Sequence, residues 1–451
     1  MLTKDISFYK SIFKISLPIA TQNLITFAIS MADTIMLGRL GEISLSASAI
    51  CNNIFFILAV VIFGVGSASS VISAQYFGKK DISSIHKVMS IMYRICIILS
   101  IFFTFISFTF SKQLISIFTN DKLVIAQGET YLRIISLGYI IYAITNCTIT
   151  ILRSVQTIKI SLVVYSVALV INLFLNWVLI FGNLGFPKLG VTGAAIATVF
   201  SRCSELLVIL IYMAKFEKKI NFKFNFLKTL DNIIAKDFIK ISTPIILNEL
   251  FWSIGASMIC IIVSRMGTKI VAANSINNIV NQFATLFIYG LSSAASVIIG
   301  NTVGEGCNKK VIEYANTICV LSMFMGLIAG ITIYLLRPIA INFYNVAYDT
   351  KTIACEIMIA TSIISVFRAL SANILMGILR GGGDNKFVFY VEMTCLWLIA
   401  IPLGFIAAFV WKLPIFWVFL VIRSDEILKS ILGFIRVVRG KWIHNITRDL
   451  N

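Results

Sequence analysis

Residues 14–19 read KISLPI, and the second half of the chain repeats this stretch as KISTPI at residues 240–245. The same shift relates many other residues of the two halves. The matched pairs include Arg39 and Arg265, Gly41 and Gly267, Ala47 and Ala273, Asn52 and Asn278, and Gly78 and Gly304. Leu152, Arg153 and Lys159 return one position further on, as Leu379, Arg380 and Lys386. The chain is therefore an internal duplication, and this repeat sets its architecture.

The composition is that of an integral membrane protein. Of 451 residues, 59% are hydrophobic and only 13% are charged, and the mean hydropathy is +0.94. Soluble domains carry about 25% charged residues. Because lipid cannot satisfy exposed backbone groups, and no alternating barrel pattern appears, the apolar segments are predicted to be membrane-spanning helices.

Twelve spans are predicted, each long enough to cross a hydrocarbon core of ~30 Å. They lie near residues 12–37, 48–77, 88–110, 127–152, 160–182, 190–214, 238–264, 272–303, 313–336, 353–379, 387–411 and 413–436. The last span contains four charged residues, so it either has a polar inner face or ends early. The first span is not a cleaved signal peptide, because its repeat partner lies in mid-chain.

The repeat divides the chain into two lobes of six spans. Residues 1–214 form an N-lobe, residues 215–237 a cytoplasmic linker, and residues 238–451 a C-lobe with a basic tail. An even number of spans in each lobe makes the repeat parallel, related by an axis along the membrane normal. The predicted fold is thus an all-α membrane protein of twelve helices in two parallel-repeat lobes.

The formal net charge of +18 reflects membrane topology rather than nucleic-acid binding. The basic residues lie in predicted loops and tails, where they meet anionic lipid headgroups. The short loops are evenly balanced between the two sides, so the Lys-rich linker and the basic tails decide the orientation. They place both termini in the cytoplasm and the chain in the cell inner (plasma) membrane.

Several classes of function are excluded by what the sequence lacks. The nine cysteines are scattered without a CxxC pair and are predicted to be buried thiols, and His86 and His444 fall in predicted loops, so no metal site is expected. No nucleotide-binding P-loop occurs, and residues 381–383, GGG, read as a turn. No cofactor, ATPase partner or enzymatic activity is predicted.

Pro18 and Pro244 occupy matched positions early in the first and seventh spans. One interpretation places each proline in the first turn of a helix, where it costs little. The other makes each a kink or hinge that moves during transport. The sequence leaves both open.

Acidic residues inside spans are functional candidates, because burying a charge in lipid is expensive. Asp33 lies in the first span. Glu249 lies in the seventh span, between Lys240 and Arg265 at its two ends, and is therefore near the midplane. Asn23 stands where Glu249 would repeat, so the two lobes have diverged chemically.

Asn172 and Asn176 lie at i and i+4 in the fifth span and share one helix face, and Thr198 in the sixth span could join them. With Asp33 they offer a carboxylate, two amide oxygens and a hydroxyl. Such hard oxygen ligands suit Na⁺, and a lone buried carboxylate also suits a proton. The alternative is interhelical hydrogen bonding without a ligand.

Glu205 and Arg368 are two further ionisable residues within predicted spans. Glu205 is expected to pair with Arg202 or to lie at the interface. Arg368 lies well inside the tenth span, unlike Arg94, Arg133 and Arg202, which are closer to span ends.

These motifs resemble the multidrug and toxic compound extrusion (MATE) family over essentially the whole chain. The first span combines Pro18 with residues 33–41, DTIMLGRLG, and the fifth span has Asn172 and Asn176 before residues 180–182, IFG. Residues 193–198, GAAIAT, and 377–384, GILRGGGD, resemble the start of that family's sixth span and the end of its tenth. Residues 244–249 resemble its seventh span.

The resemblance implies a V-shaped, two-lobed antiporter that exports cationic or amphipathic drugs in exchange for Na⁺ or H⁺. Asp33, Asn172, Asn176 and Thr198 would match the N-lobe cation site, with Na⁺ at Asp33, Asn172 and Asn176. Glu249 would match a C-lobe acidic position. Some members have aspartate where Asn176 stands, and some have an acid in the tenth span where this chain has Arg368 and Asn373 instead.

The sequence thus predicts a cation-coupled multidrug antiporter in which drug and cation compete for overlapping carboxylates. A lipid-linked oligosaccharide flippase of related architecture is the main alternative, and it would require several arginines converging on one cavity. A passive channel or scaffold is a third possibility.

Overall fold

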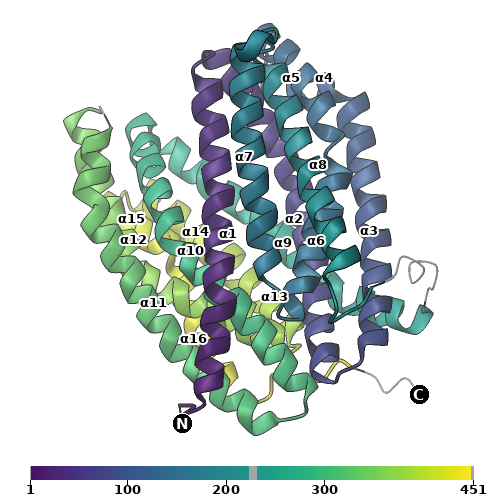
Figure 1. The fold of residues 1–451 in the computed structure, drawn as a ribbon. Helices are drawn as coiled ribbons and strands as arrows, with labels where there is room; N and C mark the ends of the chain where they lie inside the picture. The colour runs from purple at the N-terminus through teal and green to yellow at the C-terminus, as the bar shows by residue number, and fades with distance from the viewer. Residues whose placement is uncertain (1, 223–230, 345, 448–451) are drawn as a thin grey trace. The chain divides into compact units, whose positions relative to one another are not determined.

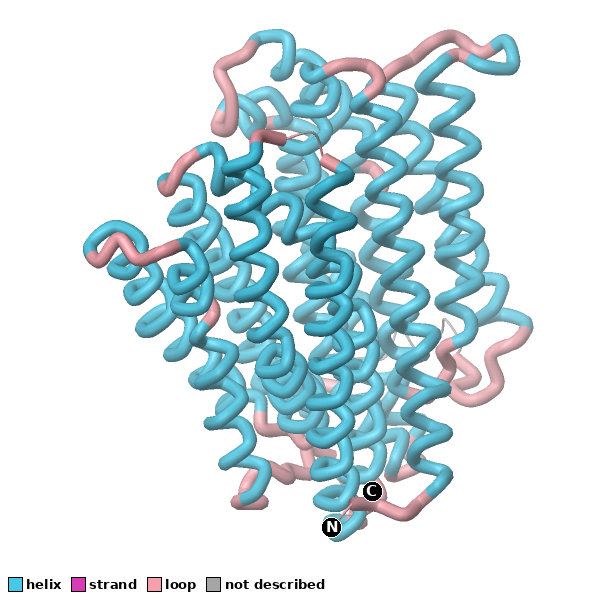
Figure 2. The backbone as a smooth tube through the Cα atoms, turned by 90° about the vertical axis from the view of Figure 1, so that its left-hand side faces the viewer, coloured by secondary structure: helices cyan, strands magenta, loops and turns pink. Residues whose placement is uncertain are grey.

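The computed structural model describes residues 2–222, 231–344 and 346–447, so linker residues 223–230 lie outside the described part. Every element in the described part is a helix, joined by loops and turns (Figures 1 and 2). The chain forms two compact units. Unit 1 contains Met1–Ala20, Ala74–Asp81 and Thr243–Asn451, and unit 2 contains Thr21–Ser73 and Ile82–Ser242.

Three long helices pass from one unit to the other: α1 (Ile6–Gly38), α2 (Glu42–Gly78) and α9 (Asn232–Arg265). The remaining helices of unit 2 are α3 (Ile82–Thr109), α4 (Ser111–Ser116), α5 (Lys122–Ser136), α6 (Tyr139–Ser154), α7 (Lys159–Phe181), the short η1 (Asn183–Gly185) and α8 (Val191–Lys215). Those of unit 1 are α10 (Thr268–Gly304), α11 (Asn308–Phe343), α12 (Tyr348–Ala372), α13 (Asn385–Met393), α14 (Ile401–Phe405), α15 (Ile415–Ile422) and α16 (Ser424–Val438), with π-helical turns η3 (Asn373–Leu379), η4 (Thr394–Ala400) and η5 (Ile406–Val410).

Among the described residues, ten helices are long and apolar enough to span a membrane, and an eleventh span is added if α5 and α6, bent by 48°, count as one. Twelve were predicted. The difference is the last segment, which forms α15 and α16 with a break at Arg423. Neither α15, with 8 residues, nor α16, with 15, is long enough to span a membrane by itself, and four charged residues, Arg423, Asp425, Glu426 and Lys429, lie at and just after the break.

The polar residues of this last segment form an inner face, which was one of the two predicted outcomes. Asp425, Lys429 and Ser430 are buried, whereas Ile431 and Leu432 are exposed. The Lys429 Nζ lies 2.7 Å from Asp425 Oδ2, so the buried charges neutralise each other. Pairing is what allows charged groups to lie inside a membrane bundle.

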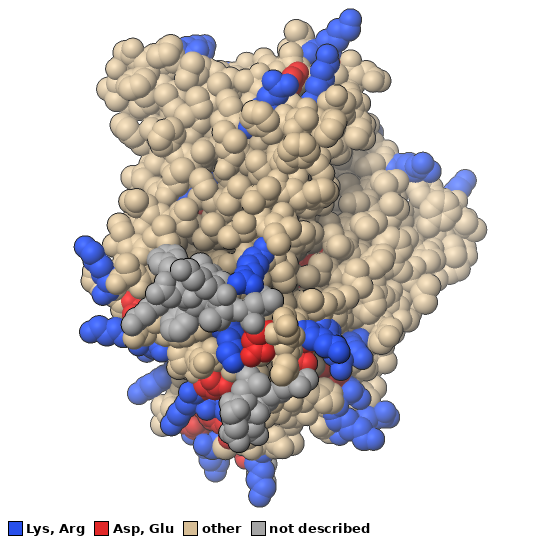
Figure 3. Space-filling view, turned by 90° about the vertical axis from the view of Figure 1, so that its right-hand side faces the viewer, with Lys and Arg blue, Asp and Glu red and all other residues tan. Residues whose placement is uncertain are grey.

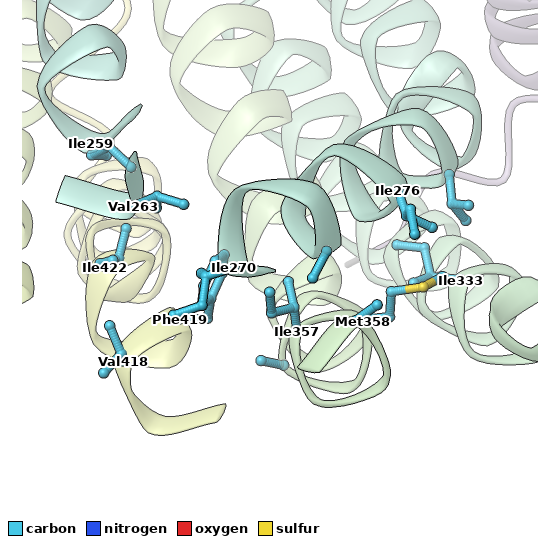
Figure 4. Close-up of a cluster of buried hydrophobic side chains, with 14 of the residues drawn as sticks. Ile259, Val263, Ile270, Ile276, Ile333, Ile357, Met358, Val418, Phe419 and Ile422 are labelled. Atoms are coloured by element: carbon cyan, nitrogen blue, oxygen red, sulfur yellow. The ribbon is translucent and has the colours of Figure 1, made fainter. Parts of the chain in front are cut away.

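The interior of unit 1 also contains a hydrophobic cluster (Figure 4). Its buried side chains come from α9, α10, α11, α12 and α15 and include Ile259, Ile276, Ile333, Met358 and Phe419. Because lipid tails are as apolar as these side chains, close van der Waals packing rather than water exclusion holds such helices together.

The internal repeat is visible as a reciprocal contact between the ends of α2 and α10. A Cβ added at Gly78 would overlap the Asn301 carbonyl oxygen, and one at Gly304 would overlap the Gln75 carbonyl oxygen. Gly78 and Gly304 are repeat partners, and Gln75 and Asn301 are related by the same shift in sequence. Two copies of one motif that contact each other reciprocally are related by local two-fold symmetry.

Both ends of the described chain pack at one end of unit 1. The Thr3 amide donates to Thr317 Oγ1 at 3.0 Å, and Tyr314 donates to Asp5 at 2.9 Å, both near the start of α11. The Ile446 amide donates to Gln75 Oε1 at 2.9 Å, beside the end of α10.

The two prolines lie inside long helices, so the first-turn interpretation is wrong. Pro18 lies about three turns after Ile6, where α1 begins, and Pro244 lies about three turns after Asn232, where α9 begins. Each therefore removes one hydrogen bond from the interior of its helix. Each also lies close to the point where its helix passes between the units.

Three local expectations need correction. His86 lies in α3, not in a loop, and its Nε2 is 2.7 Å from the Ile220 carbonyl oxygen. Arg380 directly precedes the predicted turn at residues 381–383, and the basic residues were expected in loops and tails, but it is buried. The cysteines are only partly buried, since Cys203, Cys260 and Cys307 are exposed. Residues 381–383 do form the expected turn, with Gly383 at φ +89°.

Candidate functional site

Unit 2 contains a cavity of about 300 Å³ enclosed by α1, α2, α5, α6, α7 and α8. Its polar lining includes three of the predicted site residues, Asp33, Asn172 and Thr198. Its aromatic lining consists of Phe55, Phe56, Tyr131, Tyr139, Tyr142 and Tyr165. A cavity of this size that combines aromatic walls with a few convergent polar groups is typical of a small-molecule site.

Asp33 and the two asparagines form a connected hydrogen-bonded group at one wall of the cavity. The amide nitrogen of Asn176 donates to Asp33 Oδ1 at 2.5 Å and to Asn172 Oδ1 at 3.1 Å. Asn172 and Asn176 are almost completely buried on α7, as their i, i+4 spacing predicted. The three residues thus come together from α1 and α7, while Asn176 itself does not reach the cavity lining.

One acceptor in this group has no partner. The Asn176 Oδ1 atom is buried and makes no hydrogen bond to any described residue. A buried amide oxygen without a donor is costly unless a ligand or water supplies one. As a hard oxygen, it is an atom that could ligate a cation.

Thr198 lines the cavity but is not bonded to this group. Its hydroxyl donates to the Ala194 carbonyl oxygen of its own helix, α8, at 3.0 Å. Threonines in membrane helices commonly make this bond to the preceding turn. The predicted set of four therefore separates into three connected residues and one wall residue.

A pair of oppositely charged side chains on α8 faces the same cavity. Arg202 Nη1 lies 3.1 Å from Glu205 Oε2, which confirms the predicted pairing. The Arg202 guanidinium also lies over the Tyr142 ring at 4.9 Å from its centroid. Sequence reasoning found the pair but not its place in the cavity, nor the four tyrosines, because a helix buried in apolar surroundings gives no sign of which face points inward.

The predicted acidic position of the C-lobe lies in unit 1 and is neutralised by an arginine. Glu249 on α9 lies 2.7 Å from the Arg380 Nη2, and both side chains are almost fully buried. The neighbouring residue, Asn248, donates to the buried carboxylate of Glu392 on α13. Glu392 was not singled out from the sequence, although the rule that drew attention to Glu249 applies to it equally.

Arg368, the predicted interior arginine, also has a partner. Its Nη2 donates to the Tyr289 hydroxyl at 2.9 Å. Arg368 and Arg380 in unit 1 are thus both held in specific polar contacts.

We expect Arg380→Met alone to lower the free energy of unfolding by about 3 kcal/mol, because it leaves Glu249 as an unpaired buried charge. The double variant Glu249→Gln/Arg380→Met removes both charges and should recover most of that loss. Thermal melting of the purified protein in detergent measures both. Lys269→Met is the matched control, since its 2.6 Å pair with Asp349 is exposed and should matter little. A double variant no more stable than Arg380→Met would show that the pair is not a unit.

The duplicated sequence matches one protein family in both halves. The profile of the MatE family matches residues 18–178 and again residues 244–406. The chain belongs to the MatE family. The two matches begin at the repeat partners Pro18 and Pro244, so they reproduce the internal repeat. MatE proteins are transporters, which agrees with the prediction that the chain is not an enzyme.

Relatives of similar length carry the name NorM. The chain is 24% identical over 439 residues to the probable multidrug resistance protein NorM of Thermotoga maritima, covering 96% of this chain and 93% of that protein. It is 27% identical over 417 residues to the probable multidrug resistance protein NorM of Bacillus cereus, covering 90% of each.

Solved structures share the fold over nearly the whole chain. A MOP superfamily transporter from Pyrococcus furiosus matches with a TM-score of 0.87 at 19% identity, covering 98% of this chain and 99% of that one. The Vibrio cholerae MATE transporter VcmN in its bent form matches with a TM-score of 0.86 at 15% identity, covering 96% of this chain and 97% of that one. The all-helical membrane fold predicted from the sequence is thereby confirmed.

Proposed function

We propose that this MatE transporter is a secondary active multidrug antiporter, which exports cationic or amphipathic small molecules in exchange for Na⁺ or H⁺ by alternating access. The observation that carries the proposal is the Asp33 carboxylate at the wall of an aromatic cavity, hydrogen-bonded to Asn176. An aromatic cavity with a carboxylate suits an organic cation, which gains from both the charge and the ring faces.

The proposed mechanism is competition at one carboxylate. A transported cation and a coupling ion both require the negative charge of Asp33, so binding of one weakens binding of the other by linkage. Exchange follows if the coupling ion binds from outside and the released drug leaves there. A ligand shifts the two access states only by binding them differently.

Both candidate coupling ions fit the donor set. For Na⁺, the ligands would be Asp33, the unpartnered Oδ1 of Asn176 and the amide oxygen of Asn172. For H⁺, the Asp33 carboxylate alone would carry the proton. Thr198 contributes to the cavity wall. We assign Glu249 a structural role, because Arg380 already neutralises it.

Residues 1–214 and 238–451 are proposed as the two lobes of the transporter, joined by residues 215–237, and Pro18 and Pro244 are proposed as hinges within α1 and α9. Support comes from the position of each proline, which interrupts its helix where the chain passes between compact units. Helices bend most readily at such interruptions.

For the hinge, we expect Pro18→Ala and Pro244→Ala to slow transport several-fold without destabilising the protein, because alanine restores helical hydrogen bonding. Initial rates of dye efflux and thermal melting give the two readouts. Pro338→Ala is the control, since Pro338 lies inside α11, far along the chain from any point where the chain passes between the units. Equal rates in all three variants and the wild type would remove the prolines from the mechanism.

We further propose the cell inner membrane as the location, with both termini in the cytoplasm and the lipid bilayer as the surrounding partner. In Figure 3, most Lys and Arg side chains in view gather at the lower end, and a broad area above them carries few charges. A basic cytoplasmic side next to an apolar belt is the expected pattern.

The alternative function, a lipid-linked oligosaccharide flippase, has less support. Its lipid-linked diphosphate would need several converging cations, yet Arg202 is the only arginine or lysine among the described residues that line the cavity of unit 2. Ethidium efflux tests the choice. Cells that express the chain should retain less ethidium than cells with an empty vector, and equal retention of every cationic dye tried would contradict drug export.

A further inference from the structure

The guanidinium of Arg202 is only partly used by the protein. Its Nη1 atom bonds to both carboxylate oxygens of Glu205, at 3.2 and 3.1 Å. Its Nε and Nη2 atoms make no hydrogen bond to any described residue. Since a guanidinium carries five N–H donors, most of the hydrogen-bonding capacity of Arg202 remains free.

The same contacts hold the guanidinium in place. The side chain of Glu205 is 3% exposed and uses both oxygens on one nitrogen of Arg202. The central carbon of the guanidinium lies over the Tyr142 ring, 4.9 Å from its centroid, and over the Phe55 ring, 5.9 Å from its centroid. A planar fork fixed by an ion pair and an aromatic face loses little freedom when it binds a further anion.

The Arg202 side chain lines the cavity and is more accessible than its partner Glu205. Arg202 and Glu205 both belong to the lining, and the Arg202 side chain is 23% exposed, whereas that of Glu205 is 3% exposed. The cavity therefore presents a fixed cation with free donors in addition to the Asp33 carboxylate, and aromatic rings complete its walls. A guanidinium edge of this kind binds a carboxylate in a bidentate manner.

We propose that Arg202 is a specificity-determining residue that recognises a carboxylate on the transported molecule. The transporter then favours aromatic zwitterions, which carry both a cation and a carboxylate, over cations of the same shape that lack the carboxylate. This inference rests on the proposed export function, and it assigns to the same cavity a second point of recognition beside Asp33.

Rhodamine 110 and rhodamine 123 form a matched pair of probes, because the first has a free carboxylate and the second is its methyl ester. Binding of each dye to the purified protein in detergent is measured by fluorescence polarisation. We expect the wild type to bind rhodamine 110 about tenfold more tightly than rhodamine 123, as a charge-assisted bidentate contact provides. In Arg202→Gln/Glu205→Gln, which leaves no unpaired charge, the preference should disappear.

The control is the second Arg–Glu pair of unit 2, which lies outside the cavity. Arg133 Nη2 is 2.8 Å from Glu129 Oε1 on α5, and Arg133→Gln/Glu129→Gln should keep the wild-type preference. Arg202→Lys, which keeps the charge but removes the fork, is a second variant and should lower the preference even if the double variant fails to fold. A wild type with no preference for rhodamine 110, or a preference unchanged by the Arg202 variants, would overturn the inference.

Transport separates this inference from the function on which it rests. If wild-type proteoliposomes move neither dye under any ion gradient, the antiport proposal fails, whatever the binding data show. If they move both dyes equally well, and binding shows no difference, antiport survives and the role of Arg202 does not.

Discussion

Asp33→Asn is expected to reduce gradient-driven dye efflux by about tenfold or more, the size of a typical coupling between two ligands at linked sites. The variant keeps an oxygen that can accept from Asn176, which now bonds to Asp33 Oδ1 at 2.5 Å, so the packing of α1 against α7 should survive. Only the negative charge is lost. Without that charge, neither a Na⁺ ion nor a proton binds at residue 33 in competition with the drug.

The control for this prediction is Asp121→Asn. Asp121 caps α5, where its side chain accepts from the Leu123 amide, and asparagine serves equally well as a cap. That variant removes one carboxylate from unit 2 outside the cavity and should transport normally. Full efflux by Asp33→Asn, with a correctly folded protein, would move the coupling site away from α1.

Gly78→Ala and Gly304→Ala should each destabilise the protein by more than about 4 kcal/mol, the range reached when overpacking meets atoms that cannot move aside. Each new Cβ would overlap a backbone carbonyl oxygen, of Asn301 or of Gln75. Because the oxygen belongs to the main chain, relief requires the helices α2 and α10 to separate. The two effects should be similar, since the contacts are reciprocal.

Yield and melting temperature of the purified variants measure this effect. Gly38→Ala is the control, because Gly38 ends α1 and a Cβ there meets no atom within 4 Å. If both Gly78→Ala and Gly304→Ala melt at the same temperature as Gly38→Ala, the ends of α2 and α10 do not pack as described. If only one is destabilised, the contact is not symmetric.

The repeat made much of the fold predictable. A helix pattern that returns in the second half of the chain predicted two equivalent halves, and the equivalence extends to Gly78 and Gly304 at the crossing of α2 and α10. The sequence did not predict how early α1 and α9 begin. Their early turns carry charges, such as Lys10 in α1 and Lys236 and Asp237 in α9, and fell outside the predicted spans, so both prolines seemed to be near helix ends.

The candidate site was predictable only in part. The i, i+4 spacing of Asn172 and Asn176, with the Asp33 carboxylate in another span, was enough to predict a polar cluster, and the resemblance implied that this cluster is a cation site. The inward direction of Arg202 and of the tyrosines was not predictable. In a membrane protein, lipid-facing and buried surfaces are both apolar, so periodicity does not identify the inner face.

Of the buried ion pair between Glu249 and Arg380, only Glu249 was predictable from the sequence. Its carboxylate stands out in an apolar span, but Arg380 is followed by residues 381–383, GGG, which indicate a turn at the membrane surface. The structure buries the arginine just before that turn, where its long side chain reaches Glu249. Pairs of this kind depend on tertiary placement, which one sequence does not reveal.

The most direct test is ethidium transport by wild-type proteoliposomes under a Na⁺ gradient and a H⁺ gradient, each imposed alone. We predict that one of the two gradients drives ethidium against its own concentration gradient, and that dissipating that gradient with the matching ionophore abolishes the transport. Ethidium movement that only follows its own concentration gradient, whichever ion gradient is imposed, would contradict cation-coupled antiport.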